Sequence, residues 1–275
     1  LYEDRDGRIA SLLDEGVEGV SYVDVDEEVD RHRFRLVQDA SIIERIAAAF
    51  AGESIYIADG HHRYETALVY QQEQRARSGG VPEGQPWDYI SMTLTAFSDP
   101  GLFISPVYRV LTGIDLPSVE QIEAGLSRYF SMDYVPAGKA LARSAPVGEM
   151  ALMAVAGLRA GMLAELRQKP GVDLGAEVPG DHSSEYRTFN VSILNHVVMT
   201  KVLRINPDGE GVSYSPDLEA VVDSVQSGRA QMAFLLAPAH PMLVKKIADQ
   251  QERMPRKSTY FYPKAPTGLV AYALR

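Results

Sequence analysis

The hexapeptide Asp59-Gly60-His61-His62-Arg63-Tyr64 gathers the side chains of this sequence that are best suited to binding a phosphate. It follows a short apolar run over Ile55–Ala58 and opens a stretch of helical composition over residues 65–73. We therefore predict a strand, a glycine turn and a helix start in that order. The free N–H groups at a helix start and the helix dipole attract anions. The pattern predicts an anion site, and most directly a phosphate site.

Each residue of the hexapeptide has its own expected role. The carboxylate of Asp59 can hold Mg²⁺ or accept a proton. Gly60 permits a left-handed backbone or the close approach of a ligand. His61, His62 and Arg63 supply donors, and the guanidinium of Arg63 can bond to two phosphate oxygens at once. We predict Asp59 and His62 as catalytic residues, Asp59 as a Mg²⁺ ligand, and Gly60, His61, His62 and Arg63 as phosphate-binding residues.

Two other interpretations of the hexapeptide are less favoured. In one, Asp59 only caps the helix and the histidines pack or face water, but three consecutive nitrogen side chains at a helix start are rare without a ligand. In the other, His61 and His62 bind zinc. Adjacent positions point in different directions and no third ligand lies nearby, so the sequence disfavours zinc.

A second group of cations, hydroxyls and aromatic rings lies near the C-terminus, in residues 253–264 (RMPRKSTYFYPK). Its four cations form a local positive patch in an acidic chain. We predict that Lys257, Ser258 and Tyr260 bind a phosphate or nucleotide, with Lys257 as a point charge and a tyrosine stacked on a base. The alternative, a solvated basic edge followed by a core strand over Thr267–Leu274, stays open.

Two histidine-containing segments have ordinary structural interpretations. Residues 181–185 (DHSSE) have the composition of a catalytic triad, but they lie in one loop without a nucleophile elbow, so acyl transfer has little support. His196 lies in an apolar helical stretch, where a satisfied core histidine is commoner than a ligand. Neither segment enters the predicted site.

The composition narrows the function classes. The chain has 275 residues, a net charge of −10 and no cysteine. The absence of cysteine excludes disulfides, zinc–thiolate sites and cysteine nucleophiles, and it fits a reducing cytoplasm. The acidic balance argues against nucleic acid and anionic membranes, because no excess of cations replaces their counterions. We therefore predict a cytoplasmic protein with a small phosphorylated ligand, and we leave homo-oligomerisation open.

The predicted elements follow one another in the order of an α+β or mixed α/β protein. We expect two domains, residues 1–113 with the hexapeptide and residues 114–275 as a further α+β region whose tail packs back on the first. The first residue is not methionine, and we interpret the chain as N-terminally trimmed.

Three segments together resemble the bacterial domain-of-unknown-function family 1015. They are Ile57–Ala67 around the hexapeptide, residues 253–264, and residues 267–270. The resemblance runs over essentially the whole chain, and residues 99–102 and 191–194 fit it as well. Members of this family are longer, so the resemblance implies an N-terminal region before Leu1.

The hexapeptide is also similar to the signature of the ParB/sulfiredoxin-like superfamily, which includes the archaeal free-serine kinase. That similarity implies a nucleotide-binding core in which Asp59–Arg63 bind phosphates, with a nucleotide and Mg²⁺ as cofactors. The sulfiredoxin cysteine has no counterpart here, and the DNA-binding helices of ParB are not evident. The implied function is phosphoryl transfer from ATP or ADP to a small, serine-like hydroxy acid. A non-catalytic nucleotide sensor or scaffold and a phosphomonoester hydrolase are the alternatives.

Overall fold

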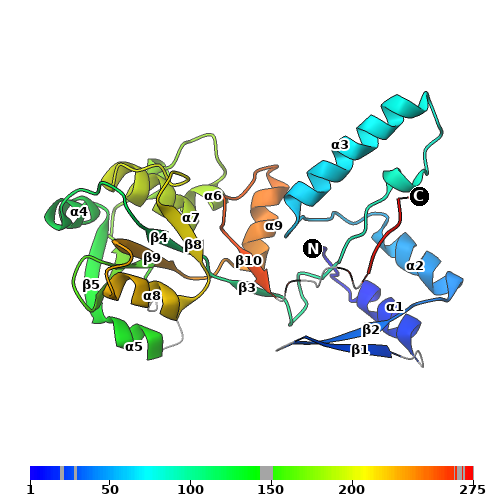
Figure 1. The fold of residues 1–275 in the computed structure, drawn as a ribbon, viewed down its shortest axis with the longest axis horizontal. Coiled ribbons are helices and arrows are strands. Elements are labelled where there is room, and N and C mark those ends of the chain that lie inside the picture. Colours follow the sequence, from blue (N-terminus) through cyan, green and yellow to red (C-terminus); the bar gives the residue numbers. More distant parts are fainter. Residues whose placement is uncertain are drawn as a thin grey trace. The chain divides into compact units, whose positions relative to one another are not determined.

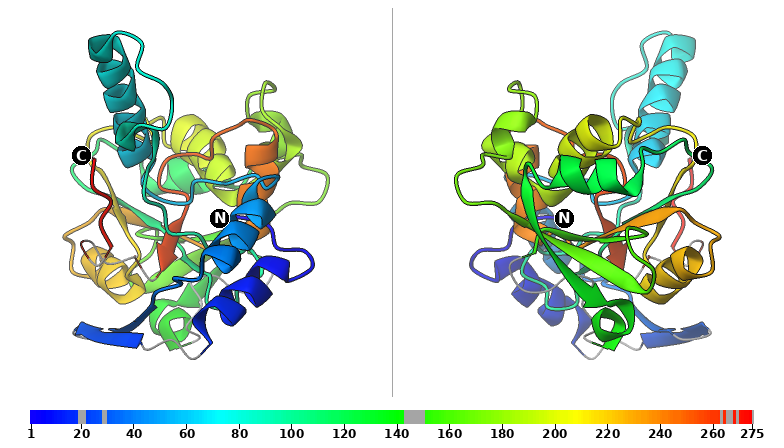
Figure 2. Two further views of the ribbon diagram at one scale, coloured as in Figure 1. Left: turned by 90° about the vertical axis from the view of Figure 1, so that its right-hand side faces the viewer. Right: turned by 90° about the vertical axis from the view of Figure 1, so that its left-hand side faces the viewer.

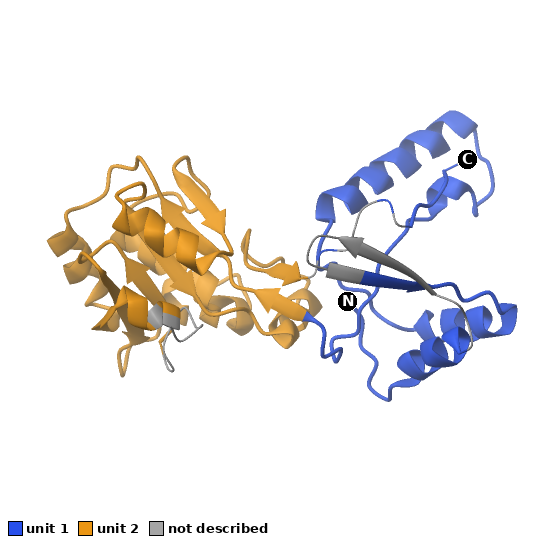
Figure 3. Ribbon diagram, turned by 60° about the horizontal axis from the view of Figure 1, so that its bottom comes forward, with its two compact units in different colours: residues 1–102, 263–275 blue, residues 103–262 orange. Residues whose placement is uncertain are grey.

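The computed structural model describes residues 1–18, 22–27, 30–142, 151–262, 264, 268 and 270–274. The chain divides into two compact units, Leu1–Leu102 with Pro263–Arg275 (unit 1) and Phe103–Tyr262 (unit 2), shown in Figure 3. Both contain helices and antiparallel strands, so the predicted α+β class is confirmed. Compact units do not by themselves define domains, and the boundary predicted at residue 113 stays a prediction.

Unit 2 is built around a six-stranded antiparallel sheet with the strand order β5-β7-β6-β9-β4-β8. Alternate residues of a strand face opposite sides of a sheet. Accordingly, Met153 and Val155 join one core cluster, whereas Ala154 and Ala156 join the other. The strands are β4 (Tyr108–Leu111), β5 (Phe130–Pro136), β6 (Met153–Ala156), β7 (Met162–Gln168), β8 (Val212–Ser215) and β9 (Met232–Leu236).

Helices cover both faces of this sheet, which is why the central strands β6 and β9 are buried along their whole length (Figures 1 and 2). One face packs against α4 (Val119–Leu126), α7 (Asn190–Ile193) and the π-helix η3 (Leu194–Val202). The other packs against α5 (Ala137–Ala142) and α8 (Leu218–Gln226). Unit 2 therefore has three layers with the sheet in the middle.

Shorter elements complete unit 2. A two-stranded ribbon pairs β3 (Phe103–Ser105) antiparallel with β10 (Tyr260–Tyr262). The chain therefore enters and leaves unit 2 on paired strands. The remaining elements of unit 2 are η2 (Gly175–Glu177), α6 (Ser184–Thr188) and α9 (Pro241–Asp249).

Unit 1 is more open than unit 2. Its helix α1 packs on α2, whereas α3 lies apart from both (Figure 1). No residue of α2 or α3 is buried. The carboxylate of Asp88 links η1 to α3, since it accepts hydrogen bonds from Gln71 and Arg75. The elements are α1 (Arg8–Val17), β1 (Tyr22–Glu27), β2 (Asp30–Arg35), α2 (Ala40–Phe50), α3 (His61–Ser78) and η1 (Pro86–Asp88).

The strand predicted over Ile55–Ala58, before the hexapeptide, is not formed. Its main-chain partner is the first residue: the Leu1 ammonium donates to Tyr56 O at 2.6 Å, and Tyr56 N donates to Leu1 O at 2.8 Å. A strand needs a ladder of such bonds, and one residue does not supply it. The segment is therefore irregular, although its sequence has strand character.

The C-terminal strand that was one interpretation of Thr267–Leu274 falls partly outside the described residues. Those that are described, 268 and 270–274, contain no strand and are exposed. Within the described part of the chain, no helix combines the length and the apolar character that a membrane crossing requires.

Candidate phosphate-binding site

The hexapeptide forms the first turn of α3. Gly60 is the N-cap residue, with φ at 82°, in the left-handed region that favours glycine. The first helical hydrogen bond runs from Tyr64 N to Gly60 O at 3.0 Å. The N–H groups of His61, His62 and Arg63 precede that bond, and no side chain caps them in the described part of the chain. These donors are therefore available to water or to a ligand.

Other long helices of the chain use a side chain at this position. Asp39 caps α2, Ser118 caps α4 and Asp217 caps α8. α1 has a glycine at its N-cap as well, Gly7, but there the carboxylate of Asp4 accepts hydrogen bonds from two N–H groups of the first turn. In α3 no such side chain within the described residues bonds to these donors, so they are left for another acceptor.

The side chain of Arg63 folds back over the start of its own helix. Its Nη2 lies 3.1 Å from Asp59 Oδ2, and a Cβ placed on Gly60 would meet its Nε and Nη2 at 2.9 Å. Lys264 Nζ approaches the other oxygen, Asp59 Oδ1, at 3.3 Å. The Arg63 side chain is 76% exposed, so a dissolved anion can reach it. Two cations and the free N–H groups thus lie together around Asp59.

The two histidines are exposed. His62 is 98% exposed, with Nδ1 3.4 Å from Glu65 Oε2, and His61 also faces solvent. No group of three or more acidic or histidine side chains within the described ranges is arranged to hold a metal. Both oxygens of Asp59 already contact cations. In this geometry the Asp59 carboxylate is engaged by cations, and its role as a Mg²⁺ ligand stays a prediction.

The C-terminal residues predicted to bind phosphate lie in unit 2. Lys257 is exposed and has a left-handed backbone, with φ at 56°. Ser258 is buried, and its Oγ donates to Pro255 O at 2.5 Å. Tyr260 begins β10. These residues form a tight turn that leads into a strand, and their participation in phosphate binding stays a prediction.

The segment with triad-like composition contributes to a polar cluster of a different kind. The His182 ring stacks on Tyr186 at 3.9 Å, and His182 Nδ1 lies 3.6 Å from Glu252 Oε1. Ser183 donates to that carboxylate from Oγ at 2.6 Å and from N at 2.7 Å, which lowers the pKa of Glu252. Because Ser183 bonds to the carboxylate and caps α6, this is no acyl-transfer triad. Burial lowers the pKa of His196 nearby.

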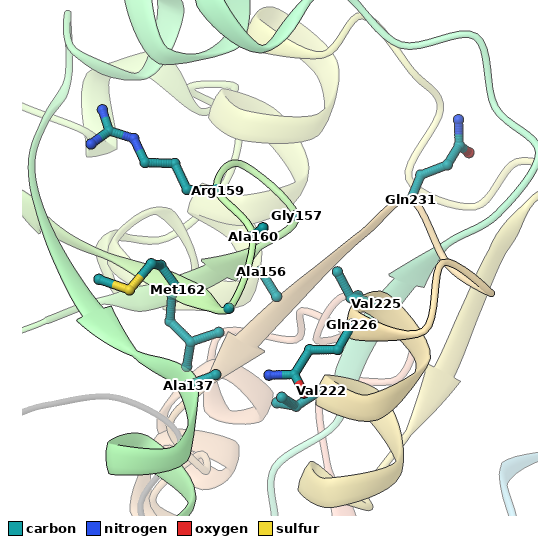
Figure 4. A pocket seen from close by; sticks show the side chains of 12 residues that line it. Ala137, Ala156, Gly157, Arg159, Ala160, Met162, Val222, Val225, Gln226 and Gln231 are labelled. Carbon is teal, nitrogen blue, oxygen red and sulfur yellow. The ribbon is translucent and has the colours of Figure 1, made fainter.

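A cavity of about 490 Å³ lies in unit 2, between α5, the turn joining β6 to β7, and α8 (Figure 4). Two of the polar side chains that line it, Arg159 and Gln231, already have partners. Arg159 pairs with Glu123 at 3.2 Å, and the amide of Gln231 bonds to the main chain of Ile114. None of the predicted site residues lines this cavity.

One charged side chain in the core of unit 2 was not predicted from the sequence. Arg109 lies on β4 and is 1% exposed. The residues on either side of it, Tyr108 and Val110, are also buried. Its Nη1 donates to Val107 O at 2.6 Å, and its Nη2 donates to Arg256 O at 3.3 Å. Burial lowers the pKa of Arg109 to about 10. An arginine within a short strand is ordinarily expected to face solvent, so only the structure identifies this one.

Comparisons with known proteins give one family and distant structural likenesses. Residues 1–193 match the family described as "Protein of unknown function (DUF1015)". No curated protein matches the chain. A conserved hypothetical protein from Pyrococcus furiosus is 13% identical, with a TM-score of 0.35 over 74% of this chain and 68% of that one. A free serine kinase in complex with AMP is 13% identical, with a TM-score of 0.39 over 88% and 87%. Likenesses with TM-scores below 0.5 are too distant to transfer a site.

Proposed function

The chain belongs to the family of proteins of unknown function DUF1015, and we propose that it binds a nucleotide at the start of α3 and transfers a phosphoryl group to a small hydroxy acid. The observation that supports this is the uncapped helix start, where the N–H groups of His61, His62 and Arg63 lie beside an exposed guanidinium. Helix N-termini and arginine side chains are the usual donors to phosphate oxygens. The hydroxy-acid acceptor follows the similarity of the hexapeptide to that of the free-serine kinase.

In the proposed reaction, the acceptor hydroxyl oxygen forms a bond to the terminal phosphorus as the bond from that phosphorus to the bridging oxygen breaks. The hydroxyl proton passes to Asp59, and the nucleotide leaves one phosphate shorter. Arg63 and His62 offset the charge on the transferred oxygens. The protein positions the two substrates and offsets charge on the transferred phosphoryl group, and no covalent intermediate forms on the protein.

A second function, nucleotide sensing without catalysis, also has an observation in its favour. Both oxygens of Asp59 contact cations, Arg63 on one side and Lys264 on the other. The carboxylate can accept a proton only after one of these cations moves. A sensor needs the phosphate contacts and no base, so turnover distinguishes the two functions.

Two arginines on α3 provide a matched test of the site. Arg63 pairs with Asp59 and is 76% exposed, and Arg77 pairs with Glu73 at 3.7 Å and is 71% exposed. Replacing either by alanine removes one exposed cation from the same helix. We expect Arg63→Ala to weaken ATP binding by roughly 10- to 100-fold, the contribution of charge-assisted hydrogen bonds. Because Arg77 lies at the far end of the helix, Arg77→Ala should leave ATP binding unchanged.

Thermal shift with MgATP, MgADP and AMP measures binding, and formation of ADP with L-serine as the first acceptor measures transfer. A nucleotide at about 100 times its Kd adds about 2.7 kcal/mol of stability. The proposed site is wrong if no nucleotide stabilises the wild-type protein, or if both alanine variants lose affinity equally. Binding without ADP formation across a set of hydroxy acids supports the sensor.

A further inference from the structure

Among the described residues, the guanidinium of Arg109 is a buried charge without a carboxylate partner. No acidic group lies within ion-pair distance of it in the described part of the chain, and its contacts are two main-chain carbonyls and the Tyr214 ring, whose centroid is 5.4 Å from Cζ. The Tyr214 hydroxyl in turn donates to Asp208 Oδ1 at 3.4 Å. Burying a charge without an ion pair is costly, so a strand of this sheet has no packing reason to carry arginine here.

One of its two carbonyl partners lies far along the chain from β4, whereas the other, Val107 O, directly precedes that strand. Nη2 of Arg109 donates to Arg256 O, in the turn over Pro255–Ser258 that precedes β10. A second bond, from Ser258 Oγ to Pro255 O, closes the same turn. The turn is therefore fixed at two points, one of them by a charge from the core of unit 2.

This anchoring determines what the turn presents to solvent. In a trans peptide the C=O and the following N–H point in opposite directions. Because Arg256 O points to Arg109, the N–H of Lys257 points away from the core. Lys257 itself has a left-handed φ of 56°, which is unfavourable for a residue with a side chain and persists where surrounding contacts hold it.

The outer face of the turn carries positive charge that is not neutralised. Arg256 and Lys257 are exposed, and neither forms an ion pair within the described residues. We propose that Arg109 is a positioning residue, which holds the Pro255–Ser258 turn in the form in which Arg256 and Lys257 bind the phosphates of a nucleotide. This rests on the proposed function, since it assumes a phosphorylated ligand.

ATP titrations of the full chain test this with four variants. We expect Arg109→Met and Lys257→Ala each to weaken ATP binding by about tenfold, which is the contribution of one charge-assisted hydrogen bond. In the double variant the loss should be clearly smaller than the two single losses combined, because Arg109 acts through the turn that carries Lys257. Arg187→Met is the control, since Arg187 also donates to a main-chain carbonyl of unit 2, that of Gly175 at 2.8 Å, and should leave ATP affinity unchanged.

Trypsin provides a readout that needs no ligand. It cleaves after Arg256 and Lys257, so release of the turn should accelerate cleavage at these two bonds in Arg109→Met and leave it unchanged in Arg187→Met. If Arg109→Met does not fold, Ser258→Ala removes the other clamp from outside the sheet. That variant should show the same faster cleavage and weaker ATP binding.

The outcomes separate this inference from the proposed function. Unchanged cleavage at the turn, unchanged ATP affinity in Arg109→Met, or additive losses in the double variant overturn the inference alone. If wild-type protein binds neither ATP nor inorganic triphosphate, the proposed function fails, together with the phosphate-binding role of the turn. In that case the cleavage comparison still decides whether Arg109 holds the turn.

Discussion

Replacing Gly60 with alanine tests whether the start of α3 depends on a residue without a side chain. Gly60 has φ at 82°, and alanine in the left-handed region costs about 1–2 kcal/mol. The new Cβ would also meet the Arg63 guanidinium at 2.9 Å. That group is the mobile end of an exposed side chain, so it moves at little cost but leaves its position. We expect a free energy of unfolding lower by about 1–2 kcal/mol and ATP binding weaker by about tenfold.

Gly60→Asn separates the two effects of the substitution. Asparagine adopts the left-handed conformation more readily than alanine, so it should lower the free energy of unfolding by less than about 1 kcal/mol. Its Cβ meets the guanidinium of Arg63 in the same place, and its side chain can also accept from the N–H groups of the first turn, so its loss of ATP affinity should be at least that of alanine. In an Arg63→Ala background, Gly60→Ala should cause no further loss of ATP affinity.

The single tryptophan provides the stability assay. Trp87 lies in η1, which Asp88 links to α3, so its fluorescence during urea unfolding follows unit 1. Calorimetric titration gives the ATP affinity. Equal stability of the alanine variant and the wild type would refute the left-handed cap. Normal ATP affinity in both Gly60 variants would refute a phosphate contact by Arg63.

Three further predictions concern the stability of the fold. The hydrogen bond from the Arg75 guanidinium lowers the pKa of Asp88 from its ordinary 3.8 to about 2. The ionised carboxylate therefore stabilises the fold fully above pH 3.8, and this contribution is lost as the pH falls to about 2. In acid unfolding followed by fluorescence, Asp88→Asn should make stability depend less on pH over this range. Ser192 Oγ is buried near Tyr186 but outside hydrogen-bond geometry, so Ser192→Ala should raise the free energy of unfolding by up to about 1 kcal/mol in urea. Gly157 has φ at 105°, and a Cβ there would lie 2.4 Å from a main-chain oxygen, so Gly157→Ala should lower that free energy by about 3 kcal/mol, measured by circular dichroism.

Each of these three has a clear opposing result. Identical acid unfolding of Asp88→Asn and wild type would show that the carboxylate has an ordinary pKa. A less stable Ser192→Ala would show that its hydroxyl has a partner. A Gly157→Ala variant of wild-type stability would show that the β6–β7 turn has room for a side chain.

The strands of the unit 2 sheet were predictable because each pairs with neighbours along its length. Residues 153–156 and 232–236 are apolar without interruption, which indicates burial on both faces, and they form β6 and β9. Residues 55–58 and 89–97 have similar strand character but form no strand. The sequence pattern shows which side chains suit a strand. A strand also needs a neighbouring strand to pair with, and that neighbour can lie far away in the sequence.

The candidate site likewise has a part that could be predicted from local sequence and a part that depends on long-range contacts. The hexapeptide is a local feature, so its position at a helix start could be predicted from glycine and the apolar residues around it. The contact of Lys264 with Asp59 and that of Arg109 with Arg256 join distant parts of the chain. No local pattern encodes either contact, and Arg109 was missed for that reason.

The distance along the chain between Arg109 and its second carbonyl has a consequence for the order of events during synthesis. The two residues are 147 positions apart. At translation rates of about 5–20 residues per second, Arg256 follows Arg109 after roughly 7–30 s. The strands on either side of β4, β8 and β9, are made only late in that interval, over Val212–Ser215 and Met232–Leu236. The strands β5, β6 and β7 can pair in the meantime. The guanidinium therefore becomes fully bonded only after Arg256 has been made, and a chain halted earlier carries it without its second acceptor.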